Sequence, residues 1–134
     1  MSSPLFASTT IPILEQVVQF TQARHGVLAG NLANLDTPGY RVRDLSPELF
    51  QERLRQVVQG DRYATPVSPG DSAYDHFAEV KDSMRSILYH DSSDVSLEQQ
   101  VMEITKNQMQ HNLALTIMTS QFRLLQAAIS EQVV

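Results

Sequence analysis

Apolar residues recur at helical spacing in two long stretches, one near each end of the chain. Steps of four and three residues alternate in both, which is the a/d repeat of helices that pack along each other. The seam positions are Leu14, Val18, Thr21, His25, Leu28, Leu32 and Leu35, then Leu97, Val101, Ile104, Gln108, His111, Leu115, Met118, Phe122, Leu125, Ile129 and Gln132. We predict a mainly α-helical fold in which the two long helices pair as an antiparallel, coiled-coil-like hairpin.

The pattern also divides the chain into segments. We expect a flexible N-terminal segment over 1–13, an axial helix over 14–36 and a second axial helix over 96–132. Between them, 37–95 reads as a turn followed by an irregular middle segment with short helices. A hydroxyl at Ser96 could cap the second long helix.

Polar residues near the centre of both seams predict a register. If Leu35 lies opposite Leu97, residue numbers across the seam add up to about 132. Thr21 then faces His111, and His25 lies near Gln108. Such a polar layer costs stability but selects one alignment.

The middle segment shows weaker signals. Ser46 and the proline after it form a good helix start, and one apolar face continues until Gly60, which we expect to end the helix. Residues 61–72 read as a loop. Apolar residues between 77 and 88 predict another helical turn or two, although Ile-Leu-Tyr at 87–89 could equally be a short strand.

A tight turn follows the first long helix. Thr37 precedes Pro38 and is pushed out of the helical region, so the helix should end at about Asp36. Thr37 to Tyr40 then fits a type II turn, with glycine accepting a positive φ at its third position. Asn31 and Asn34 lie one helical turn apart beside small residues, where another backbone could approach closely.

Composition excludes several classes of protein. The 134 residues have a net charge of -5 and ten scattered Lys and Arg residues, which argues against a nucleic-acid surface. The chain has no cysteine, so disulfides and thiolate metal sites are excluded. The N-terminus lacks the basic and apolar regions of a cleavable signal, and no run is apolar enough to span a membrane.

Catalytic patterns are also missing from the sequence. His25, His76, His90 and His111 lack the spacing of a metal site, and no glycine-rich phosphate loop is present. We therefore expect no catalytic, metal or cofactor-binding residues. A small hydrolase using His90 and Asp91 is a minor alternative.

Residues 31–40, Asn-Leu-Ala-Asn-Leu-Asp-Thr-Pro-Gly-Tyr, resemble the N-terminal signature of the bacterial flagellar rod and hook protein family. That signature reads Ala-Asn-(Ile/Leu)-Ala-Asn-x-x-Thr-Pro-Gly-Tyr. Residues 94–112 and the ending Phe-Arg-Leu-Leu-Gln-Ala-Ala-Ile at 122–129 are similar to the C-terminal helix of its proximal-rod branch. Gly30 and Leu35 depart from the family pattern, and 46–89 carry no motif that aligns.

The resemblance implies a structural, non-enzymatic subunit of the flagellar basal body, with a single assembly domain like the D0 domain. Such a subunit is exported by the flagellar type III apparatus without a cleaved signal and joins a helical tube that transmits motor torque. The implied location is the rod in the periplasm near the inner membrane.

The implied partners are copies of the chain, the rod proteins FlgC, FlgF and FlgG, the junction protein FliE and the export gate, with no nucleic acid or small-molecule substrate. The implied subunit contacts are Asn31, Asn34, Thr37, Pro38, Gly39 and Tyr40. The alternative is a coiled-coil scaffold or adaptor of another secretion system.

Overall fold

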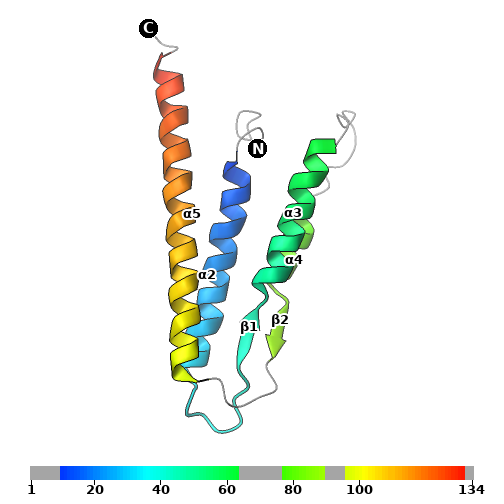
Figure 1. The fold of residues 1–134 in the computed structure, drawn as a ribbon, viewed down its shortest axis with the longest axis vertical. Coiled ribbons are helices and arrows are strands. Elements are labelled where there is room, and N and C mark those ends of the chain that lie inside the picture. Colours follow the sequence, from blue (N-terminus) through cyan, green and yellow to red (C-terminus); the bar gives the residue numbers. More distant parts are fainter. Residues whose placement is uncertain (1–9, 64–76, 90–95, 132–134) are drawn as a thin grey trace.

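One helix, α2 (Ile11–Ala33), runs through the middle of the molecule and organises the rest. The computed structural model describes residues 10–63, 77–89 and 96–131. The long helix α5 (Leu97–Glu131) lies antiparallel to α2 on one side, while α3 (Pro47–Tyr63) and α4 (Ala78–Ser83) lie on the other (Figure 1). The predicted mainly helical fold with an antiparallel hairpin of long helices is confirmed.

A small antiparallel sheet joins the middle segment to the base of the hairpin. Strand β1 (Arg43–Leu45) pairs with β2 (Ile87–Tyr89), with Arg43 opposite Tyr89 and Leu45 opposite Ile87. The stretch that could have been helix or strand is therefore a strand. The expected loop over 61–72 lies outside the described residues from 64 onward.

The helix ends follow local chemistry. α2 begins at Ile11, three residues before the predicted start, because Pro12 fits the first turn, where its missing N–H costs nothing. It ends at Ala33 rather than Asp36. The hydroxyl of Ser46 accepts a hydrogen bond from the Leu49 N–H (3.1 Å), and that of Ser96 accepts one from the Gln99 N–H (3.2 Å), so both predicted caps form.

Gly60 does not end α3, contrary to the prediction. The helix continues to Tyr63, with Gly60 in its last turn. A glycine inside a helix costs only about 1 kcal/mol relative to alanine, so it weakens the helix without ending it.

The apolar core lies between α2 and the middle segment. Phe20 of α2 stacks on Phe50 of α3, with ring centroids 4.1 Å apart and planes 11° from parallel. Leu45 of β1 and Val80 of α4 complete this buried cluster. Among the described residues the cluster has no member from α5. The face of α2 that does not meet α5 is thus covered by the chain's own middle segment.

The contact between α2 and α5 is more polar than the seam pattern indicated. The buried residues of α5, within its described length, are Gln100, Asn107 and Ala114, spaced seven apart. Ile104 and His111, which belong to the predicted seam, are half-buried between them, and the seam residues Met118 and Leu125 are half-buried beyond Ala114. Gln100, Asn107 and Ala114 each come one residue before a predicted seam position. The face of α5 that meets α2 is therefore shifted around the helix from the predicted seam.

Several predicted seam residues accordingly lie on the surface. They are Leu32 and Leu35 of the N-terminal region and Leu97, Val101, Leu115, Phe122 and Ile129 of α5. His25 and Gln108 are also exposed, Leu14 and Val18 are half-buried, and Leu28 is buried. The physical reason is close approach: the amide of Asn107 donates to the Thr21 carbonyl at 2.7 Å, which a larger apolar side chain at that position would prevent.

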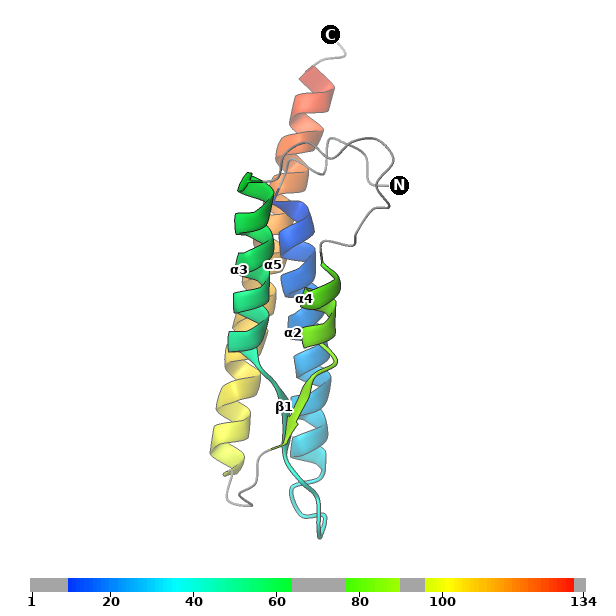
Figure 2. The same cartoon turned by 90° about the vertical axis from the view of Figure 1, so that its right-hand side faces the viewer.

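α5 continues past the N-terminal end of α2 (Figure 2). It has 35 residues against 23 in α2, so it is longer by about 18 Å at about 1.5 Å per residue. None of the helices in the described parts of the chain is long and apolar enough to cross a membrane.

Candidate functional site

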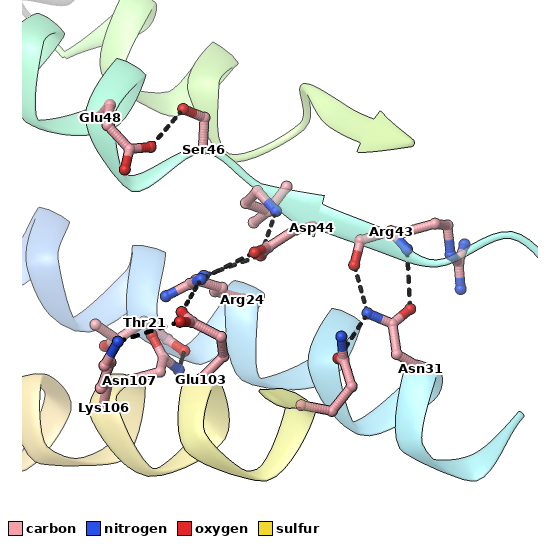
Figure 3. Close-up of polar contacts among 12 residues, drawn as sticks. Thr21, Arg24, Asn31, Arg43, Asp44, Ser46, Glu48, Glu103, Lys106 and Asn107 are labelled. Atoms are coloured by element: carbon pink, nitrogen blue, oxygen red, sulfur yellow. Dashed lines mark hydrogen bonds and ion pairs between the residues drawn. The ribbon is translucent and has the colours of Figure 1, made fainter. Parts of the chain in front are cut away.

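The C-terminal end of α2 is held to β1 by the side chain of Asn31. Its Nδ2 donates to the carbonyl oxygen of Arg43, and its Oδ1 accepts from the Arg43 N–H at 3.0 Å (Figure 3). The same Nδ2 lies 3.3 Å from Oε1 of Gln100 on α5. Asn31 is completely buried, so it joins three elements from within rather than facing a neighbour directly.

The predicted turn forms as a type II turn. The Tyr40 N–H donates to the Thr37 carbonyl at 3.2 Å, and Gly39 has φ +76°. Asn34 supports the turn from the helix end, since its Nδ2 donates to the Gly30 carbonyl at 2.8 Å and its Oδ1 accepts from the Thr37 hydroxyl at 3.2 Å. Thr37, Pro38 and Gly39 are exposed, so the turn presents a polar tip at the base of the hairpin.

Tyr40 folds back onto α2. Its hydroxyl donates to Oδ1 of Asn31 at 3.2 Å and accepts from Nη2 of Arg43 at 3.3 Å. Both side chains lie over Gly30, where an added Cβ would be 3.7 to 3.8 Å from them. The signature from Asn31 to Tyr40 is therefore a connected set of contacts that fixes the corner between α2 and β1.

A second polar centre lies on α2 about two helical turns before Asn31. The guanidinium of Arg24 donates from Nε and Nη2 to the two oxygens of Asp44, both at 2.9 Å, and from Nη2 to Oε2 of Glu103, also at 2.9 Å (Figure 3). Lys106 approaches the other oxygen of Glu103 at 3.4 Å. The side chain of Arg24 is only 7% exposed, so this ion pair set links α2, β1 and α5 in a water-poor site.

The charges of this centre stabilise one another. The hydrogen bond to Asp44 raises the pKa of Arg24 above its ordinary value, against the opposing effect of burial. The hydrogen bond from Arg24 lowers the pKa of Glu103 below its ordinary value, again against burial. Sequence reasoning did not predict this set of ion pairs.

The predicted register itself is confirmed. Oγ1 of Thr21 and Nδ1 of His111 are 2.8 Å apart. His25 and Gln108 line the same cavity between α2 and α5, of about 290 Å³. The polar layer inferred from the seam centres therefore exists and lies where the register requires.

The structure does not describe the residues of the alternative hydrolase site. His76, His90 and Asp91 lie outside the described residues. Within residues 10–63, 77–89 and 96–131, no three His, Asp or Glu side chains are grouped closely enough to hold a metal ion.

Known proteins similar to this chain decide the family. The flagellar basal body rod protein FlgB of Aeromonas hydrophila is 32% identical over 120 residues, which cover 81% of this chain and 84% of that protein. The chain belongs to the FlgB family. FlgB of Escherichia coli is 26% identical over 119 residues, covering 81% and 84% of the two chains. FlgB of Bacillus subtilis is 25% identical over 126 residues, covering 92% and 95%.

No family model matches the chain. The FlgB alignments nevertheless extend well beyond the two motif regions, since an alignment that covers 92% of the chain must include most of the middle segment. The chain is thus a flagellar basal body rod component. Its similarity to FlgB covers most of its length, including the segment that carries no recognisable motif.

Proposed function

We propose that this chain is a structural subunit of the proximal rod of the bacterial flagellum. In this proposal it is exported by the flagellar type III apparatus without a cleaved signal and joins a helical tube that transmits motor torque. The tube lies in the periplasm near the inner membrane. The names of its relatives support a place in the rod. The apolar residues on the surface of the folded chain support assembly with other subunits.

One observation supports the proposal most strongly: Gln100, Asn107 and Ala114 are the buried residues of α5, while most of its large apolar residues are exposed. Met109, Leu113, Leu124 and Ile129 are all more than 60% exposed. Large apolar side chains exposed in this number along one helix mark a protein contact. The chain is therefore folded as a subunit that is completed by neighbours.

The corner of α2 and β1 is the second proposed contact region. We propose that Thr37, Pro38, Gly39 and Tyr40 contact neighbouring subunits, while Asn31 and Asn34 hold the turn in place. The buried amide of Asn31 and the capping amide of Asn34 fit this supporting role, because both bond within the chain. Exposed tips positioned by a rigid scaffold are common binding surfaces.

The proposed partners follow from a rod of several proteins. They are further copies of this chain, the rod proteins FlgC, FlgF and FlgG, the junction protein FliE and, during export, the export gate. No enzymatic step, cofactor, nucleic acid or small-molecule substrate is part of the proposal.

The test is complementation in cells that lack the gene. Cells carrying the wild-type chain should swim, and their isolated basal bodies should contain complete rods by electron cryomicroscopy. Cells without it should stop before rod completion. Complete rods in the deletion strain would overturn the proposal.

A further inference from the structure

The two strands of the small sheet differ in how their edges are used within the described residues. β1 lies between α2 and β2 (Figure 1). On the α2 side, the N–H and the carbonyl oxygen of Arg43 both bond to the side chain of Asn31. The Leu45 N–H donates to the carboxylate of Asp44 at 2.7 Å. Neither Arg43 nor Leu45 therefore gives its N–H to β2.

These bonds determine which residues of the sheet pair through their backbones. In a strand, the N–H and carbonyl of one residue point to the same side, and those of the next residue point to the opposite side. Asp44 therefore bonds to β2, where its partner in the register is Leu88. The N–H and carbonyl groups of Ile87 and Tyr89 then point away from β1. Among the described residues, none bonds to these groups.

This outer edge of β2 lacks the features that usually prevent another strand from pairing. Natural edges are commonly covered, or carry lysine or proline. The residues of β2 are Ile87, Leu88 and Tyr89, which are 39%, 48% and 56% exposed. A helix bonds its own N–H and carbonyl groups internally, whereas an extended backbone can bond to a strand edge. The occupant that matches this edge is therefore a strand.

Two exposed arginines give the edge a positive charge. Arg85 comes two residues before β2, and the Arg41 guanidinium lies 5.5 Å from the centroid of the Tyr89 ring at its other end. A second copy of β2 in antiparallel pairing would bring Arg85 of one copy toward Arg41 of the other, and like charges repel. A strand with an acidic residue at each end would place an opposite charge near both arginines.

We infer that the outer edge of β2 binds an extended, acidic segment of another protein as a third strand. The segment exchanges backbone hydrogen bonds with Ile87 and Tyr89, and its carboxylates lie near Arg41 and Arg85. The backbone bonds supply affinity, and the charges select acidic sequences. Because β2 has only three residues, an isolated segment binds weakly. This surface is separate from α5 and from the tight turn, so the inference goes beyond the proposed function.

The test is an NMR titration of the nitrogen-15-labelled full-length chain with a synthetic peptide. The peptide has about seven residues, in which threonine and valine alternate between two terminal glutamates, a composition that favours an extended backbone. We expect the amide signals of Ile87 and Tyr89 to shift most, with a Kd on the order of 1 mM. The Leu88 signal should shift less, because its N–H faces β1. The same peptide with lysine in place of glutamate should bind at least about threefold more weakly.

Matched variants separate the backbone edge from the side chain. Tyr89→Pro removes an outward N–H, which an edge strand tolerates, so it should lose most of the binding. Tyr89→Val removes the same ring but keeps the N–H, and it should bind within about threefold of the wild type. A peptide that is N-methylated at every interior residue should not bind the wild-type chain. That comparison decides the matter even if Tyr89→Pro fails to fold.

Several results would overturn the inference. One is the absence of shifts at Ile87 and Tyr89 at about ten times the expected Kd of the acidic peptide. Equal binding of the lysine peptide, the N-methylated peptide or a folded Tyr89→Pro variant would do the same. Shifts of these two signals that grow with the concentration of the chain alone would show that a second copy covers the edge. The titration uses the isolated chain, so a negative result leaves the proposed function standing.

Discussion

The side-chain amide of Asn31 pairs with both backbone polar groups of Arg43, twelve residues further along the chain. A primary amide offers one donor and one acceptor side by side, so it can occupy the edge of β1 as a neighbouring strand would. The other edge of β1 pairs with β2. Asn31 therefore fixes where the chain leaves α2 and enters the sheet.

Asn31→Asp should destabilise the fold by about 2–3 kcal/mol, because the change removes a buried donor and directs a carboxylate at the Arg43 carbonyl. The free energy of unfolding in urea measures this. Asn112→Asp, on the exposed side of α5, should change it by less than about 0.5 kcal/mol. Equal stability of the two variants would contradict the role given to Asn31.

Gly39→Val should destabilise the turn by about 1–2 kcal/mol and prevent rod assembly, because a β-branched residue is strained at φ +76°. Swimming in soft agar and electron microscopy of basal bodies are the readouts. Gly26→Ala is the matched control, since an added Cβ there has no other atom within 4 Å. In the middle of α2 it should stabilise by up to about 1 kcal/mol and leave motility intact. A motile Gly39→Val strain would refute the prediction.

The Arg24 centre should make stability depend on pH in the acid range. Arg24 lowers the pKa of Glu103 in the folded chain, so the unfolded chain binds a proton there more readily. The stability from this group is fully present above the ordinary glutamate pKa of about 4.3. It is lost as the pH falls through that value toward the lower folded pKa.

Glu103→Gln should therefore reduce the free energy of unfolding at pH 7 by about 1–2 kcal/mol. Its stability should approach that of the wild type at an acid pH below the lowered pKa of folded Glu103, where the wild-type carboxyl is protonated too. Chemical denaturation at both pH values gives the comparison. Glu15→Gln, exposed on α2, should have little effect at either pH. A constant difference between wild type and Glu103→Gln across the range would refute the linkage.

A disulfide should form between cysteines introduced at Thr21 and His111. Their side chains meet across α2 and α5 at 2.8 Å, and the natural chain has no cysteine to compete. Non-reducing electrophoresis after mild oxidation reports the closed loop of about 90 residues by its faster migration. Cysteines at Thr21 and Leu113, which lies on the exposed side of α5, should not cross-link. Failure of the first pair in a folded variant would contradict the observed register.

The sequence by itself determined the features that depend on neighbouring residues. The a/d spacing indicated both long helices, and the hydroxyls of Ser46 and Ser96 marked helix starts. Pro38 and Gly39 required the type II turn, because their φ preferences are local. The polar seam centres gave the register of Thr21 and His111, since unlike layers align in only one way.

Tertiary structure decided which side of each helix is buried. Apolar spacing favoured Val101 and Leu115 at the seam, but Gln100, Asn107 and Ala114 occupy it. The buried face of α5 thus differs by one residue, or about 100° around the helix, from the predicted seam. The spacing of apolar residues alone did not distinguish these two faces. The amide of Asn107 donates to the Thr21 carbonyl of α2, and the amide oxygen of Gln100 accepts from Asn31. The ion pairs of Arg24 and the stacking of Phe50 on Phe20 also join residues that are distant in sequence. No local pattern encodes such contacts, so only the tertiary structure could show them.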